Sequence, residues 1–199
     1  MKKIILKIII LTFIFFILYG LIIYFPLIEY HIHSSNLLNS TIINSVKLND
    51  KDFKINNLLD LKQIPKDKNL LIIPKIDVYA FIIEGNSIDI LNKFEGVWRE
   101  PFGTIPGTLG NIIIAGHRWQ FLPPNTNTFF LLPQLMKEDL IIVYWKGKQF
   151  NYKIYDLYEA YPDDKKPYLI ENYSTLTLYT CTPVFIANKR FIVKARLIN

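Results

Sequence analysis

The chain has 199 residues, a formal net charge of +6, 51% hydrophobic residues and one cysteine. This length predicts a single folded domain with appendages. The lysines are scattered and form no basic stripe interleaved with aromatic residues, so we expect no nucleic-acid partner. One cysteine excludes an internal disulfide, and in an exported domain it indicates a free thiol or a bridge to another chain.

Residues 8–28 carry no charged side chain and are rich in Ile, Leu and Phe. Crossing a bilayer takes about 20 apolar residues, so this segment is long enough to span it. Three lysines precede it and Glu29 follows it, so the positive-inside rule places residues 1–7 in the cytoplasm and the rest outside. A cleavable signal peptide has a shorter apolar core and a small-residue cleavage site, which residues 24–27 do not provide. We therefore predict an uncleaved, single-pass anchor in the membrane lipid bilayer.

Residues 29–68 are predicted to be an extracellular spacer, because Asn, Ser, Lys and Asp are frequent and the hydrophobic pattern is weak. Three apolar residues recur there at the spacing of a short amphipathic helix: Leu38, Ile42 and Val46. His31 and His33 form a His-x-His pair. No third histidine, cysteine or aspartate lies nearby, so we expect solvated histidines rather than a metal site.

The folded domain is predicted to cover residues 69–199 and to consist mainly of short strands. Alternating or apolar runs predict strands at 70–74, 76–83, 110–116, 139–145, 148–156, 174–181 and 190–198. Residues 87–94 are predicted to form a short helix capped by Asn86 or Ser87, and residues 128–135 a helical turn interrupted by Pro133. Pro101, Gly103, Pro106, Gly107 and Gly110 form a cluster that is predicted to be a loop, and residues 159–168 are a polar loop. Short strands at regular spacing, without repeats, predict an all-β fold, a closed or nearly closed barrel.

The last two predicted strands carry the residues that most suggest chemistry. In one, Leu176 and Leu178 face the core and Cys181 faces away; in the other, Val193 faces the core and Arg190 faces away. If the strands pair as a hairpin, Cys181 and Arg190 lie about 5 Å apart at the backbone. A buried structural cysteine and a salt-bridged arginine are the simpler interpretations of each residue alone.

His117 follows Gly116 at the end of a predicted strand and is the only histidine in the folded domain. A cysteine thiolate is a nucleophile, and a nearby imidazole can accept its proton and return it to a leaving amine. Arg190 stays protonated and cannot act as the base. It can donate to substrate carbonyls and to an oxyanion, and one such donor is typically worth about 3–4 kcal/mol. A structural histidine remains the alternative for His117.

Three features in this order resemble the signature of the sortase family, over roughly residues 69–199. They are the sequence Thr-Leu-Tyr-Thr-Cys ending at Cys181, Arg190 at the start of the next strand, and His117 after an Ile-Ala-Gly strand end. The resemblance implies a closed eight-stranded barrel with short helices. It implies Cys181 as nucleophile, His117 as general acid/base and Arg190 as the substrate-positioning and oxyanion residue. Thr180 is expected to bind substrate through a hydrogen bond in the oxyanion region.

The resemblance also implies a function, that of a membrane-anchored, extracellular cysteine transpeptidase. It would cleave a Leu-Pro-x-Thr-Gly-like sorting signal of surface proteins through a thioacyl-enzyme. The protein would then pass to an amine acceptor of a cell wall precursor or of another surface protein. No acidic cluster indicates a calcium site, so we expect no metal and no cofactor.

The Gly-His-Arg sequence and the step from Cys181 to Arg190 are closer to sortase classes C, D and E than to class A or B. Residues 29–100 contain no Asp-Pro-aromatic lid motif. Two alternatives stay open. One is a cysteine hydrolase on the same fold, in which water resolves the acyl-enzyme, and the other is a non-catalytic, membrane-tethered binding module.

Overall fold

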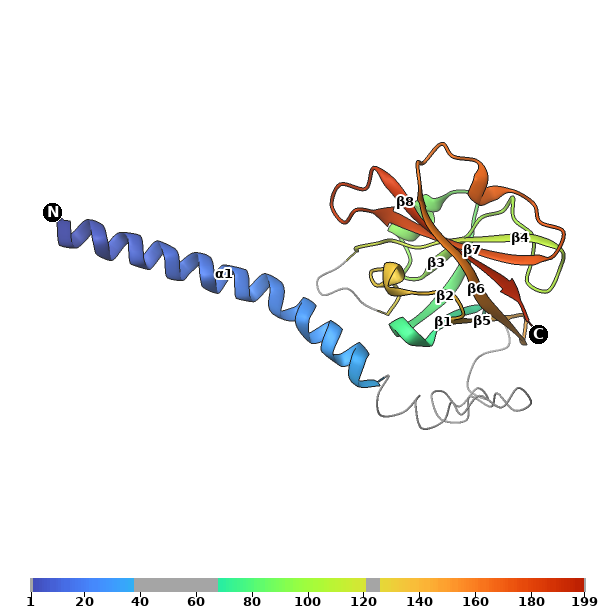
Figure 1. The fold of residues 1–199 in the computed structure, drawn as a ribbon, viewed down its shortest axis with the longest axis horizontal. Coiled ribbons are helices and arrows are strands. Elements are labelled where there is room, and N and C mark those ends of the chain that lie inside the picture. The colour runs from blue at the N-terminus through green and yellow to red at the C-terminus, as the bar shows by residue number, and fades with distance from the viewer. Residues whose placement is uncertain (1, 38–67, 121–125, 199) are drawn as a thin grey trace.

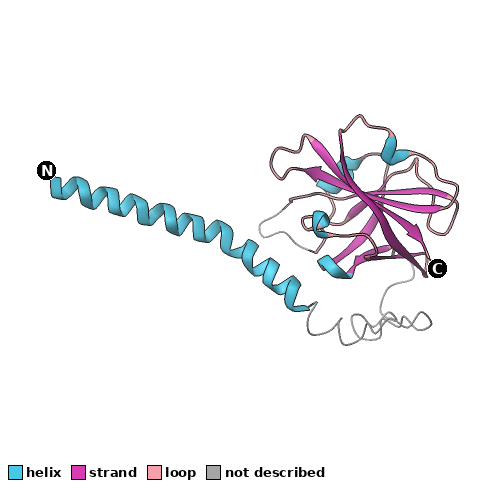
Figure 2. Cartoon of the chain, in the orientation of Figure 1, coloured by secondary structure: helices cyan, strands magenta, loops and turns pink. Residues whose placement is uncertain are grey.

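The computed structural model describes residues 2–37, 68–120 and 126–198. A long N-terminal helix, α1, is followed by a domain built almost entirely of strands (Figure 1). Figure 2 shows that the helical pieces within this domain are short turns at its periphery. The helices are α1 Lys2–Leu37 and the 3-10 helices η3 Pro74–Ile76, η4 Ile88–Asn92, η5 Leu132–Gln134 and η6 Lys166–Tyr168. The strands are β1 Leu70–Ile73, β2 Val78–Glu84, β3 Val97–Arg99, β4 Gly110–Ala115, β5 Leu140–Trp145, β6 Lys148–Ala160, β7 Ser174–Thr182 and β8 Lys189–Leu197.

The strands close into a barrel in the order β1-β2-β3-β4-β7-β8-β6-β5, with β5 paired to β1. The pairs β2–β3 and β4–β7 are parallel, and the other neighbours are antiparallel. This confirms the predicted closed eight-stranded barrel. A closed barrel leaves no unpaired sheet edge, so each strand that carries a candidate site residue is held on both sides.

Most strand ends lie within one or two residues of the sequence-based prediction, and two larger differences stand out. The strand β3 was not predicted, because three residues between glycine- and proline-rich stretches give no period-two signal. The strand β6 continues to Ala160, into the segment predicted as a polar loop, because its last residues pair with β8 up to Ala160 and Arg190. Cross-strand pairing therefore decides these ends, and it depends on a partner far away in sequence.

The helix α1 contains the segment predicted to span the membrane. Its window Lys3–Leu21 has a mean hydropathy of 2.7, and none of it is buried against protein. A helix of this length and composition can cross a bilayer. His31 and His33 lie within α1. The helix suggested by Leu38, Ile42 and Val46 falls outside the described residues.

The barrel interior holds the main core, and it includes the residues predicted to point inward from β7 and β8. Leu176, Leu178, Val193 and Ala195 are all fully buried there. The opposite face of these strands, predicted only to point away from the core, is also largely covered. Tyr179 on β7 belongs to a second buried cluster on the outside of the barrel, which gathers Leu91, Trp98, Ile113, Ala115, Ala160 and Ile192. The segment between β6 and β7 helps to cover this face, so β7 is buried on both sides.

Candidate active site

The barrel brings the ends of β4 and β7 together. These strands run parallel and side by side, with Ala115 opposite Tyr179. The backbone N–H of Gly116 donates to the carbonyl of Tyr179 at 3.2 Å, which continues the pairing by one residue. His117 and Cys181 each lie two positions beyond the Ala115–Tyr179 pair. The two predicted reacting residues therefore leave neighbouring strands at the same end of the barrel.

Cys181 and Arg190 are direct partners in the β7–β8 ladder, as the hairpin prediction required. Cys181 is a free thiol and is partly exposed. Its neighbours in the alternation, Tyr179 and Ile192, face the outer cluster, so Cys181 and Arg190 lie on that outer side. The Nη1 atom of Arg190 donates to the carbonyls of Ala187 at 3.1 Å and Lys189 at 3.0 Å. The guanidinium of the residue opposite Cys181 is thus held by carbonyl groups of its own loop.

The side chain of Thr180 is placed differently from the expectation. It is 1% exposed, and its hydroxyl donates to the carbonyl of Gly116 at 2.8 Å. This hydrogen bond joins the residue before Cys181 to the residue before His117. The hydroxyl is therefore committed to holding the two strand ends together, so we treat Thr180 as a positioning residue.

His117 is partly buried, and its environment favours the neutral imidazole. Burial lowers the pKa of His117 below its ordinary value of 6.5. Its Nε2 atom is buried and has no hydrogen-bond partner. Its carbonyl accepts from the backbone N–H of Phe129 at 2.9 Å, which fixes the chain where it leaves β4. A neutral imidazole at neutral pH can accept a proton from a thiol or an amine.

A row of aromatic rings that sequence reasoning missed lies at the same end of the barrel. The rings of Trp119 and Phe130 meet edge to face at 5.3 Å, and those of Trp119 and Phe185 at 5.4 Å. The guanidinium carbon of Arg118 lies 5.7 Å from the centre of the Phe130 ring. The row links the segment after His117 to the β7–β8 loop, which contains Phe185. Its residues come from three separate segments, so no local sequence pattern could predict that the rings meet.

The outer face next to Cys181 carries a hydrogen-bonded tyrosine. The hydroxyl of Tyr179 donates to Oε1 of Glu100 at 2.7 Å, and the ring of Tyr168 packs edge to face on Tyr179 at 6.2 Å. Burial raises the pKa of Glu100, and the hydrogen bond from Tyr179 partly offsets this. Burial and the Glu100 carboxylate raise the pKa of Tyr179, so the phenol stays protonated. The outer face next to Cys181 is thus aromatic, with one half-buried carboxyl group.

The segment between β6 and β7 is anchored by polar side chains from three adjacent strands. Asn111 of β4 donates from Nδ2 to the carbonyls of Pro167 at 2.8 Å and Leu169 at 3.2 Å, and its Oδ1 accepts from Thr177 of β7 at 2.7 Å. Lys194 of β8 is 4% exposed and forms an ion pair with Glu171 at 3.4 Å. Burial lowers the pKa of Lys194, and Glu171 opposes that shift. These contacts fix the segment that carries Tyr168.

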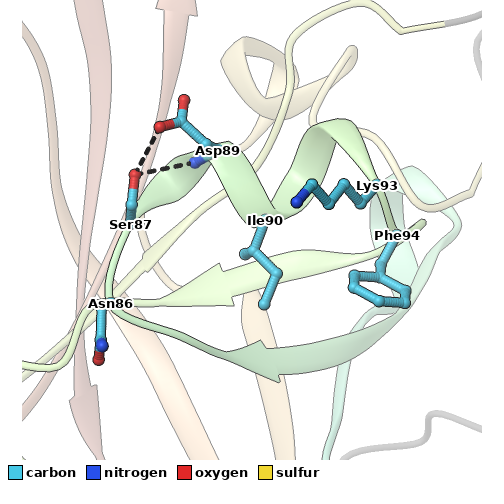
Figure 3. A pocket seen from close by; sticks show the side chains of 6 residues that line it. All are labelled: Asn86, Ser87, Asp89, Ile90, Lys93 and Phe94. Carbon is cyan, nitrogen blue, oxygen red and sulfur yellow. Dashed lines mark hydrogen bonds between the residues drawn. The ribbon is translucent and has the colours of Figure 1, made fainter.

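A shallow hollow of about 290 Å³ lies beside η4, apart from these residues (Figure 3). Its lining residues are Asn86, Ser87, Asp89, Ile90, Lys93 and Phe94. Ser87 caps η4, as predicted, by accepting from the backbone N–H of Asp89 at 3.2 Å. The hollow contains none of the cysteine, histidine and arginine residues discussed above. Among the described residues, no group of three or more His, Cys, Asp or Glu side chains could hold a metal ion.

Comparison with known proteins gives the family. The family model for the sortase domain matches residues 71–198, and no curated protein matches. A sortase D5 transpeptidase from Clostridium perfringens is 30% identical with a TM-score of 0.57, over 66% of this chain and 79% of that chain. A Streptococcus pneumoniae sortase C is 28% identical with a TM-score of 0.59, over 65% of each chain.

A third structure, a Clostridium perfringens sortase C with a C-terminal cell wall sorting motif, shares the fold. It is 24% identical with a TM-score of 0.56, over 65% of this chain and 69% of that chain. The similar structures include class C and D enzymes, as the sequence predicted, and also a class A enzyme. Because the domain model covers more than half of the chain and the barrel agrees with it, the protein belongs to the sortase family.

Proposed function

We propose that this chain is a membrane-anchored transpeptidase that cuts a Leu-Pro-x-Thr-Gly-like sorting signal and joins the cut protein to an amine. The observation that carries the proposal is the meeting of Cys181, Arg190 and His117 at one barrel end. Cys181 is paired with Arg190 in the β7–β8 ladder and tied to the His117 segment through Thr180. Sortases are cysteine transpeptidases, and this chain has a single cysteine to offer.

In the first half-reaction, His117 accepts the thiol proton of Cys181, and the sulfur attacks the carbonyl carbon of the threonine in the sorting signal. The carbon–nitrogen bond breaks, and His117 returns the proton to the leaving amine. The product is a thioester between Cys181 and the threonine carbonyl. The lowered pKa of His117 supports its part as a proton acceptor at neutral pH.

In the second half-reaction, an amine attacks the thioester carbonyl and His117 takes a proton from the attacking nitrogen. The carbon–sulfur bond breaks, the thiolate of Cys181 is released, and the proton on His117 restores the thiol. Arg190 donates to the substrate carbonyl in both tetrahedral intermediates. Its guanidinium already binds carbonyl oxygens of Ala187 and Lys189, which are the same kind of acceptor.

The N-terminal helix supports a matching location. We assign residues 1–7 to the cytoplasm, 8–28 to the membrane and 29–68 to an extracellular spacer, with residues 69–199 as the catalytic barrel. Exported surface proteins with a C-terminal sorting signal and an amine acceptor at the cell surface would be the partners. Confinement of enzyme and substrate near one membrane raises their effective concentration.

The test uses the full-length protein in detergent with a library of Leu-Pro-x-Thr-Gly-like peptides and triglycine as the amine. Mass spectrometry should find a peptide–triglycine product that the Cys181→Ala variant does not form. A cleaved peptide without the amine would show a hydrolase instead. If the wild type and Cys181→Ala behave alike with every peptide, the transpeptidase assignment fails and the binding-module alternative stands.

A further inference from the structure

Arg118 is a half-buried cation whose charge is not balanced by the described part of the chain. Its Nε and Nη1 atoms are buried without a hydrogen-bond partner. It takes part in none of the ion pairs found among the described residues. Burial lowers the pKa of its guanidinium. Buried donors without partners are costly, and a guanidinium is a strong, forked donor for carboxylate or phosphate.

The other three arginines of the chain have no buried donor atom that lacks a hydrogen-bond partner. Arg99 pairs with Glu84 and donates to the carbonyl of Glu100 at 3.3 Å. Arg190 donates to two carbonyls of its own loop. Arg196 stacks on the ring of Tyr173, with its guanidinium carbon 3.8 Å from the ring centre. Among the arginines, Arg118 therefore stands apart because its unpartnered donors are buried.

The position of Arg118 indicates which part of the reaction could use it. It directly follows His117, which in the proposed function protonates the leaving amine and deprotonates the incoming one. In that function the leaving and entering amines must therefore come within reach of His117, while Arg190 donates to the carbonyl. Arg118 follows His117 directly in the chain, so in the proposed function it is a cation close in sequence to the residue that handles the acceptor amine.

We propose that Arg118 binds an anionic group, a carboxylate or a phosphate, that the acyl acceptor carries close to its reacting amine. This rests on the proposed function and adds a property of the acceptor to it. An acceptor with such a group accepts hydrogen bonds from the unpartnered Nε and Nη1 atoms of Arg118. An amine without one leaves them unpaired and reacts less readily.

Movement of the aromatic row would let an anion reach the Arg118 guanidinium. The Phe130 ring lies over the Arg118 guanidinium, and Trp119 continues the row to Phe185. Phe185 is 82% exposed and has a φ of 74°, a conformation that residues other than glycine rarely adopt. Little buried surface is lost when Phe185 leaves Trp119, so this end of the aromatic row moves at low cost.

The experiment measures how the thioacyl-enzyme divides between aminolysis and hydrolysis, with full-length protein in detergent and a sorting peptide that it cleaves. Two acceptor pairs differ in the anionic group: L-alanine against L-alaninamide, and O-phosphoethanolamine against ethanolamine. Wild type, Arg118→Gln and Arg118→Lys are compared. The matched control is Arg196→Gln, which removes an arginine near the C-terminal end of β8. Within a pair, the difference in amine reactivity cancels when variants are compared.

We expect Arg118→Gln to reduce the preference for the anionic member of a pair by about ten-fold or more, with Arg118→Lys between it and the wild type. Arg196→Gln should keep the wild-type preference. A change in the alanine pair alone identifies a carboxylate, and a change in the phosphoethanolamine pair alone identifies a phosphate. Equal preferences in the wild type and Arg118→Gln for both pairs overturn the proposal.

A second measurement does not depend on any variant folding. With the wild type, acetate or inorganic phosphate should inhibit aminolysis by the anionic acceptor more than aminolysis by its neutral partner. Equal inhibition of both partners contradicts an anion site. If a thioacyl-enzyme forms but shows no acceptor preference, this inference alone is wrong. If no Cys181-dependent thioacyl-enzyme forms, the proposed function is wrong as well.

Discussion

The hydroxyl of Thr180 donates a hydrogen bond of 2.8 Å to the carbonyl of Gly116. It joins β7 to the chain leaving β4, one residue before Cys181 and one residue before His117. The backbone contact from Gly116 to Tyr179 lies next to it. The relative position of the thiol and the imidazole is therefore set by two hydrogen bonds that neither reacting side chain makes itself.

Replacement of Thr180 by valine keeps the shape of the side chain and removes this hydrogen bond. We expect a loss of about 1–3 kcal/mol in the free energy of unfolding, because the buried Gly116 carbonyl loses a partner. Misalignment of His117 should lower kcat/KM by roughly ten- to hundred-fold. Chemical denaturation and peptide cleavage assays measure the two effects.

Thr175→Val is the matched control for this change. Thr175 lies on the same strand and is 0% exposed, but its hydroxyl has no hydrogen-bond partner. Its removal should leave the free energy of unfolding unchanged or raise it. Equal destabilisation by both valine variants would mean that the Thr180–Gly116 hydrogen bond has no special role.

We predict that position 116 requires glycine, because the Phe129 ring leaves no room there for a Cβ atom. A Cβ atom at Gly116 would lie 2.7 Å from Cδ2 of Phe129, whose ring is fully buried in the barrel core. Gly116→Ala should cost about 1–3 kcal/mol of stability and displace the chain that carries His117. The double variant Gly116→Ala/Phe129→Leu should be more stable than the two single effects added together, as measured by a thermodynamic cycle. Additive effects would show that the ring is not the obstacle.

The sequence was sufficient to predict the barrel architecture and the pairing of the two strands that carry Cys181 and Arg190. Period-two alternation gave the faces of β7 and β8 correctly, and antiparallel pairing then required Cys181 to meet Arg190. The role of Thr180 could not be read in this way. Its motif indicated importance, but only the parallel pairing of β4 with β7 shows that its hydroxyl reaches Gly116.

The covered outer face is the main feature that the sequence did not predict. Alternation identifies an apolar face by contrast with a polar one, and Thr177 and Lys194 look like solvent-facing residues. They are buried because the segment between β6 and β7 folds over them and supplies the Pro167 carbonyl and Glu171. Such a segment has no period of its own, so its contacts depend on the finished barrel.

His117 should titrate below 6.5 in the folded protein, because burial disfavours the imidazolium. Between its folded pKa and 6.5, the unfolded chain binds more protons than the folded one. The stability contribution of His117 therefore rises with pH through this window and is lost as the pH falls through it. NMR titration of a His31→Gln/His33→Gln variant isolates His117, and a midpoint at or above 6.5 would contradict this prediction.

Asn111 is predicted to hold the segment between β6 and β7 against the barrel. It is 2% exposed and makes hydrogen bonds to the carbonyls of Pro167 and Leu169 and from Thr177. Asn111→Ala removes all three and leaves buried polar groups without partners, so we expect a loss of about 2–3 kcal/mol. Tyr168 should then leave Tyr179, which opens the outer face next to Cys181.

Hydrogen exchange tests this release directly, because it reports local opening along the chain. In Asn111→Ala, amides of residues 161–173 should exchange faster than in the wild type, while those of β5 should change little. Asn172→Ala, an exposed asparagine in the same segment, serves as the control and should leave exchange unaltered. If exchange rises evenly over the whole barrel instead, Asn111 stabilises the fold as a unit. The segment would then have no separate anchor, and Tyr168 would stay packed on Tyr179 for as long as the barrel remained folded.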